Sequence, residues 1–166
     1  MTRKYFYVGP DHILDQAVSS PGGKSVTSPE DLFKVIECFE KEFNEERGWM
    51  TYIIDMDGRL TLAPRRTEHI NCAGGNTVLG AGEIRFDREG KVLEITNNST
   101  GFCPDIGCWK AVSGALENTC LSHPDFFTSK AVFRLCNACG ERNIVKDDWF
   151  YCEICGAELS GEWNFR

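Results

Sequence analysis

Apolar residues recur along this chain with two different periods, one typical of helices and one typical of strands. Between Ser28 and Arg47 they return every three or four positions, which predicts an amphipathic helix. Ser28 can cap the start of this helix, Pro29 suits its first turn, and Gly48 ends it. The same spacing predicts further helices at residues 11–18 and 105–120.

Runs of β-branched and aromatic residues bounded by turn residues predict strands. We expect them at residues 4–8, 49–55, 59–63, 77–86, 91–96 and 131–135. Asp57-Gly58 and the stretch from Asp87 to Gly90 supply the turns of two hairpins, 49–63 and 77–96. The sequence therefore predicts an α+β fold, with two β-hairpins in an antiparallel sheet, two main helices and a cysteine-rich C-terminal segment.

The strongest chemical signal is a pair of Cys-x-x-Cys motifs with twelve residues between them. Four thiolates at this spacing can hold one ion in a closed tetrahedral site, which is typical of structural zinc. Gly140 and Gly156 follow the pairs and allow the tight turns that aim backbone amides at sulfur. The predicted ligands are Cys136, Cys139, Cys152 and Cys155.

This segment resembles the zinc ribbon family, and its spacing is similar to the iron-binding module at the end of rubrerythrins. The resemblance implies one structural Zn²⁺. Iron is the alternative, but the chain lacks the Glu-x-x-His pairs of a rubrerythrin bundle. We expect a hairpin that turns at Lys146 to Asp148, and a tail at residues 162–165 that either adds a strand or covers the ribbon with its aromatic side chains.

Two units are expected from the change in character along the chain. Residues 1–130 would form an α+β domain with a glycine-rich central hairpin, and residues 131–166 would form a zinc ribbon packed on it. A chain of 166 residues is long enough for one domain with a real core and a small metal-stabilised appendage.

Composition narrows the function classes. The net charge of −7 disfavours nonspecific binding to a phosphate backbone, and a hydrophobic fraction of 42% is that of a globular protein. Nine cysteines, an N-terminus without a signal-peptide pattern and the lack of an apolar run of about 20 residues point to a soluble protein in a reducing cytoplasm.

The glycine-rich middle of the chain carries the residues that could support catalysis. His69 precedes the first strand of the second hairpin, Glu83 lies within that strand and Ser99 follows the second strand. A histidine near a carboxylate and a hydroxyl can perform acid–base or nucleophilic chemistry. Each also has an ordinary structural interpretation: a satisfied imidazole, a partner of Arg65 or Arg85, and a turn hydroxyl. Other polar residues of this cluster are Cys72, Asn97, Thr100 and Cys103.

A second metal site is another possibility, because two Cys/His pairs have the spacing of metal ligands. Packing as small apolar side chains is the competing interpretation for the cysteines. The candidate ligands are His69, Cys72, Cys103, Cys108, Cys120 and His123.

The stretch 81–104 resembles a module of bacterial effector and toxin-like proteins, in which Ala-Gly-Glu precedes Ser-Gly-His-Tyr-x-Pro. Ala81-Gly82-Glu83, Ser99 and Pro104 match this pattern, whereas Gly101 stands where the module has histidine and Phe102 where it has tyrosine. The resemblance implies a bacterial source and no particular activity.

These observations favour a zinc-stabilised cytoplasmic recognition module without catalysis, which binds a protein partner through its glycine-rich hairpin face. One alternative is a small hydrolase or transferase that uses His69 with Glu83 or Ser99. The other is nucleic-acid binding through the ribbon, with Arg134, Arg142 and Lys146 as contacts. The oligomeric state stays open.

Overall fold

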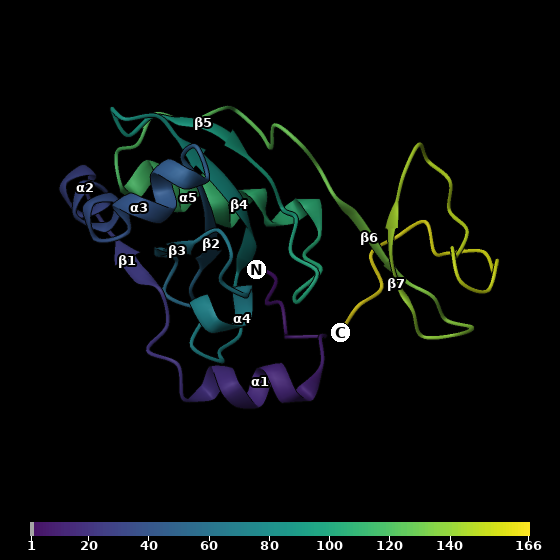
Figure 1. Ribbon diagram of the computed structural model, residues 1–166. Coiled ribbons are helices and arrows are strands. Elements are labelled where there is room, and N and C mark those ends of the chain that lie inside the picture. The colour runs from purple at the N-terminus through teal and green to yellow at the C-terminus, as the bar shows by residue number, and fades with distance from the viewer. Residues whose placement is uncertain (1) are drawn as a thin grey trace.

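The computed structural model describes residues 2–166 and contains two antiparallel sheets with helices around the larger one (Figure 1). The helices are α1 (Asp11–Val18), α2 (Pro29–Cys38), α3 (Glu40–Glu45), α4 (His69–Cys72) and α5 (Trp109–Asn118), with a 3-10 turn η1 (Ile106–Cys108). The strands are β1 (Lys24–Val26), β2 (Trp49–Ile54), β3 (Leu60–Pro64), β4 (Gly80–Phe86), β5 (Val92–Ile95), β6 (Val132–Leu135) and β7 (Arg142–Val145). The predicted α+β class is confirmed.

Both predicted hairpins lie in the larger sheet, whose strand order is β1-β3-β2-β4-β5. The hairpins β2–β3 and β4–β5 are joined because β2 also pairs with β4, from Trp49 opposite Arg85 to Ile54 opposite Gly80. The main core lies on this sheet, and its largest fully buried side chains include Tyr52, Phe86 and Leu62.

Helices α4 and α5 both lie against the central strands. The longer helix, α5, contacts β2, β3 and β4, and Val112 of this helix lies over Gly80. The four-residue helix α4 contacts β2 and β3 and carries α1 on its outer side (Figure 1). Both ends of α4 therefore have fixed positions relative to the sheet.

Several element predictions were wrong in detail. Residues 4–8 form no strand; Tyr5 makes one isolated antiparallel bridge, to Val78, which precedes β4. The helix expected over 28–47 is divided at Phe39, which leaves the helical region with φ −113° and ψ 30°. Ser28 caps α2 as predicted, accepting a hydrogen bond from the Asp31 amide.

The C-terminal ribbon pairs its strands differently from the prediction. β7 pairs with β6, so the loop between them is the first Cys-x-x-Cys motif, and Tyr151 bridges Glu158 across the second motif. A turn does occur at Asp147 and Asp148, but the segment after it does not pair with β7. The prediction failed because each cysteine motif is itself the turn of a hairpin.

The two outer edges of the small sheet differ in their hydrogen bonding. On β6, the Asn164 side chain accepts from Leu135 N at 2.8 Å and donates to Leu135 O at 2.7 Å, as a neighbouring strand would. Among the described residues, β7 has no backbone hydrogen bond on its outer side. The ribbon thus has one covered edge and one open edge.

Buried polar contacts attach the ribbon to the large sheet. Asn97 is fully buried; its amide donates to Pro104 O and Ala131 O, and its Oδ1 accepts from Ala131 N at 2.7 Å. The tail residues 162–165 form no strand, and Trp163 Nε1 donates to Cys103 O at 2.7 Å. The tail therefore ties the ribbon to the rest of the molecule as well as covering it.

No helix within residues 2–166 combines the length and the apolar character that crossing a bilayer requires.

Candidate metal centre

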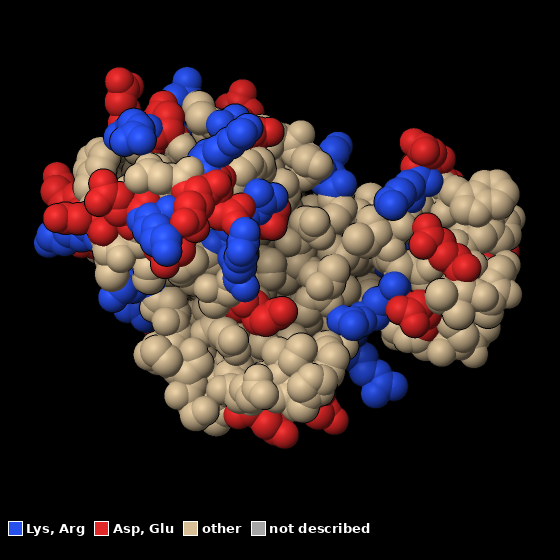
Figure 2. All heavy atoms as spheres, viewed as in Figure 1, with Lys and Arg blue, Asp and Glu red and all other residues tan. Residues whose placement is uncertain are grey.

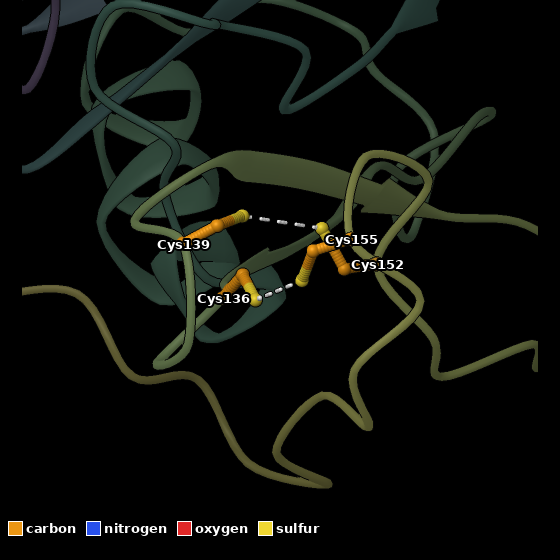
Figure 3. Close-up of side chains that lie close together, drawn as sticks. All are labelled: Cys136, Cys139, Cys152 and Cys155. Atoms are coloured by element: carbon orange, nitrogen blue, oxygen red, sulfur yellow. Dashed lines mark hydrogen bonds between the residues drawn. The ribbon is translucent and has the colours of Figure 1, made fainter.

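The four predicted ligand cysteines meet at one end of the ribbon, two from each Cys-x-x-Cys turn (Figure 3). The two turns have the same hydrogen bonds. Cys136 N donates to Glu141 O and Gly140 N donates to Cys136 O, whereas Cys152 N donates to Ala157 O and Gly156 N donates to Cys152 O. The backbone alone thus builds two equivalent loops.

Gly140 and Gly156 close these loops with φ values of 78° and 76°. This left-handed region strains any residue that has a Cβ atom, which explains the glycine after each pair.

The spacing of the sulfurs fits one tetrahedral metal ion. Cys136 Sγ lies 3.6 Å from Cys155 Sγ, Cys139 Sγ lies 3.6 Å from Cys152 Sγ, and all four sulfurs lie within 4.8 Å of one another. Metal–sulfur bonds of about 2.3 Å give tetrahedral sulfur–sulfur edges of about 3.8 Å. Disulfide sulfurs would lie about 2.05 Å apart, so these cysteines are free thiols.

Amide groups favour the thiolate form that a metal requires. The Cys155 amide, followed by the Ile154 amide and the Asn143 side chain, lowers the pKa of Cys152 to about 6. The Cys139 amide is the main cause of the lowered pKa of Cys136. The Glu141 amide acts on Cys139 in the same direction, but desolvation and hydrogen bonds with the other three thiols raise its pKa to about 12.

Four thiolates at this separation repel one another unless a cation lies between them. The donor set therefore fits a divalent metal ion, and a closed site of four sulfurs is expected to be structural. Zinc and iron both accept this geometry.

Asn143 belongs to the centre, although no pattern in the sequence indicates this. It is 5% exposed; its amide donates to Glu141 O and to Cys152 Sγ at 3.5 Å, and its Oδ1 accepts from Glu153 N. The side chain thereby links the first cysteine turn to the second.

His69, the first of the proposed catalytic residues, has a partner in the backbone. Its Nε2 donates to Gly82 O at 2.9 Å, which fixes the proton of the neutral ring on Nε2. Burial lowers the pKa of His69, against the opposing influence of the Gly82 bond and of the Glu83 and Glu68 carboxylates. These contacts match the structural interpretation of a satisfied imidazole.

Glu83 and Ser99 are not joined to His69 by any hydrogen bond among the described residues. The Glu83 carboxylate forms an ion pair with Arg65, with Oε1 3.4 Å from Arg65 Nε. Ser99 is buried, and its hydroxyl has no hydrogen-bond partner in residues 2–166. No described contact assembles the three residues into a catalytic site.

The candidates for a second metal site also lie apart. Within residues 2–166, the four-cysteine cluster is the one group of three or more potential ligands close enough to share an ion. Burial raises the pKa values of Cys72, Cys103 and Cys108 to about 12, as expected for packed thiols. Cys120 is exposed, and His123 Nδ1 donates to Pro124 O.

Two of the basic residues proposed for nucleic-acid contacts are used inside the protein. The Arg134 guanidinium donates to Ser160 O, Gly161 O and Phe133 O, and Arg142 donates to Thr100 O. Lys146 lies in the turn after β7. The ribbon therefore offers few free cations.

The glycine-rich hairpin face, which we expected to contact a partner, lies in the interior at β4. Gly80, Ala81 and Gly82 are buried, and a Cβ atom on Gly82 would lie 2.0 Å from Thr96 O. The glycines allow neighbouring backbones to approach each other closely inside the protein.

Comparisons with family models, with curated proteins and with solved structures found no match to this chain.

Proposed function

We propose that this protein is a zinc-stabilised cytoplasmic recognition module without catalytic activity, and that it binds a protein partner through the exposed tip of its ribbon. The proposal depends on one observation: the second metal-binding turn and the segment just before it carry exposed apolar side chains. Trp149, Tyr151 and Ile154 are 66%, 43% and 71% exposed within a six-residue stretch.

The arrangement of this tip supports the proposal. Trp149 lies against Tyr151 with ring centroids 4.8 Å apart, and Ile154 lies inside the second cysteine turn. Aromatic side chains held on a rigid support are frequent anchors of protein interfaces. Charged side chains crowd the surface over α2, α3 and β5, whereas the ribbon surface at the right of Figure 2 carries fewer.

Zinc is preferred over iron as the resident ion because a closed site of four thiolates is typical of structural zinc, and because the sequence lacks the Glu-x-x-His pairs of a rubrerythrin. Nine free cysteines support a reducing compartment, as the cytoplasm provides. A metal that holds the tip in shape would need no chemistry of its own, since its binding free energy stabilises the fold.

Affinity capture with defined variants tests the proposal. The tagged protein, a variant with Trp149→Ser, Tyr151→Ser and Ile154→Ser, and a control with Phe33→Ser on α2 would be compared in cells of the source organism. Phe33 is 45% exposed and belongs to α2, which lies at the opposite end of the molecule from the ribbon (Figure 1). We expect a partner retained by the wild type and the control and lost by the tip variant. Capture that is unchanged in the tip variant would contradict the proposal.

Metal analysis of the same preparations tests the second part of the proposal, the structural zinc ion. We expect one zinc ion per chain in the wild type and none when Cys152 and Cys155 are both replaced by serine. A zinc-free, fully folded wild-type protein would refute the structural role of the metal.

A further inference from the structure

A pocket far from the cysteine cluster lies between the end of α3 and the turn that joins β4 to β5. Its volume is about 310 Å³, within the range of small-ligand pockets. Arg47, Arg85 and Arg88 line it together with the turn residue Asp87. Figure 1 shows α3 and this turn at the end of the molecule opposite the ribbon.

Part of the pocket wall is apolar. Phe43 and Phe86 line it and are otherwise buried, being 6% and 2% exposed, and the half-buried Leu93 adds an aliphatic surface. A ligand would thus meet cationic groups and an apolar surface in the same pocket.

Within the described part of the chain, two of the three guanidinium groups have no carboxylate partner. Arg85 Nε donates to Glu94 Oε2 at 2.6 Å, but Arg88 donates only to the neutral Asn44 Oδ1, at 3.2 Å. Within residues 2–166, the Arg47 side chain forms no ion pair or hydrogen bond.

The Asp87 carboxylate, which lines the pocket, stabilises the turn in which Asp87 lies. Its Oδ1 accepts hydrogen bonds from Glu89 N and Lys91 N. Asp87 stays anionic and Glu94 pairs with Arg85, but the three arginines still leave positive charge in excess at the pocket, on a chain whose net charge is −7.

The backbone at Arg47 has a left-handed conformation that few side chains adopt. Gly48 N donates to Phe43 O, which ends α3 in a left-handed turn, and Arg47 enters this turn with φ 54°. Glycine or asparagine is preferred at such positions, so an arginine there is strained. Strain of this kind is frequently retained where a side chain is needed by a ligand.

We propose that this pocket binds a phosphate monoester that carries a small apolar group. Guanidinium groups pair with phosphate oxygens through two parallel hydrogen bonds, and two unpaired cations suit a dianion. The wall formed by Phe43, Phe86 and Leu93 would contact the apolar group. This site goes beyond the proposed function, because it shares no residue with the ribbon.

Phenyl phosphate is the probe, with inorganic phosphate and benzoate as the comparison ligands, in titrations of the whole protein followed by amide NMR shifts. We expect phenyl phosphate to shift the amides of Gly48 and Arg88 and to bind about tenfold more tightly than inorganic phosphate, because the ring is buried on binding. Arg47→Gln and Arg88→Gln should each weaken binding about three- to tenfold. Arg66→Gln is the control, since Arg66 is 88% exposed and outside the pocket.

Arg47→Gly separates a ligand role from a structural one. Glycine relieves the strain of the left-handed turn, so the melting temperature should rise by about 2–4 °C while phenyl phosphate binding falls as in Arg47→Gln. A lower melting temperature would show that Arg47 supports the fold instead, and would overturn its assignment to the ligand.

Two further results would overturn the proposal. One is equal binding of phenyl phosphate by the wild type, Arg47→Gln and Arg88→Gln. The other is benzoate binding as tightly as phenyl phosphate, which would exclude a preference for a dianion.

Discussion

The Asn143 side chain connects the two cysteine turns, because it contacts Glu141 in the first turn and Cys152 and Glu153 in the second. A neutral donor to a ligand sulfur stabilises the thiolate and fixes its direction. The residue therefore contributes to metal affinity without touching the metal.

Replacing Asn143 with alanine should weaken zinc binding by about 10- to 100-fold, because the hydrogen bond to Cys152 Sγ and the link between the turns are lost. Competition with a chromophoric chelator measures the affinity. Asn137→Ala is the matched control, since Asn137 is exposed within the first turn and donates to no sulfur. Equal affinities for both variants would contradict this role of Asn143.

His69 should make the stability of the protein depend on pH. Burial lowers its pKa in the folded protein, whereas an unfolded chain titrates near 6.5. The unfolded state then takes up the proton first, so the free energy of unfolding should decrease as the pH falls from about 7 toward the folded pKa.

An NMR titration of the His69 ring proton should give a pKa below 6.5, and His69→Gln should show a smaller loss of stability over the same pH range. A measured pKa above 6.5 would show that the Gly82 bond and the nearby carboxylates outweigh burial.

Single residues differ in how clearly the sequence reveals their roles. The four cysteines were predicted because their spacing is specific for a shared ion. Asn143 was missed because an asparagine in a short strand has no spacing signal. The Arg65 partner of Glu83 was one of the structural interpretations expected from the sequence, whereas the Gly82 O partner of His69 follows from the position of α4 against the sheet.

At the scale of elements, the ribbon strands β6 and β7 are held by the cysteine turns and by two small clusters of buried residues. One cluster contains Phe133 and Phe165, and the other contains Leu159 beside the cysteines. The main core does not include these residues. Metal binding and the large sheet are thus supported by different side chains.

Removing the metal with a chelator should therefore unfold the ribbon and leave the five-stranded sheet folded. Hydrogen exchange should become fast in β6 and β7 while β2 and β4 keep their protection. Loss of protection in β2 and β4 at the same rate would contradict this expectation.

Two glycine substitutions should have opposite effects on the free energy of unfolding. In Gly82→Ala the new Cβ would lie 2.0 Å from Thr96 O, so β4 and β5 must separate, at a cost of about 3 kcal/mol or more. Gly114 lies on α5, and the Cβ added by Gly114→Ala would have no atom within 4 Å, so this variant should stabilise the protein by about 0.5–1 kcal/mol. Chemical denaturation measures both, and similar values for the two variants would contradict the close approach of backbones at Gly82.

Elements with a strong local pattern were the predictable ones. The hairpin β2–β3 has a turn motif and a clear apolar run, and α2 has a capping serine. β1 and α4 were missed because they contain three and four residues, too few to show a period, and they exist through contacts with β3 and with α1. The pairing of β7 with β6 was missed because each cysteine motif is also the turn of a hairpin, and the spacing of the cysteines does not reveal this second role.

At the scale of the whole molecule, Asn97 joins the large sheet to the ribbon. It lies just after β5, is fully buried, and its hydrogen bonds with Ala131 and Pro104 hold the start of β6. The division into residues 1–130 and 131–166 remains a prediction, and Asn97 connects its two sides.

Asn97→Ala should lower the free energy of unfolding by about 3 kcal/mol, because the buried Ala131 N–H and two carbonyl groups lose their partner. Asn98→Ala is the control, since Asn98 is exposed one residue further along. We also expect Asn97→Ala to let the ribbon unfold at a lower denaturant concentration than the sheet, as followed by the amide NMR signals of β6 and of β2. An unchanged single transition would contradict the coupling.

The four cysteines are not equally accessible: Cys136 and Cys152 are buried, whereas Cys139 and Cys155 are exposed. Each turn thus contributes one sheltered sulfur and one sulfur open to water. We expect an ion to enter and leave from the open side, so that a competing chelator replaces Cys139 or Cys155 first. Exchange of the ion should therefore begin at these two sulfurs, while Cys136 and Cys152 should be the last to release the ion.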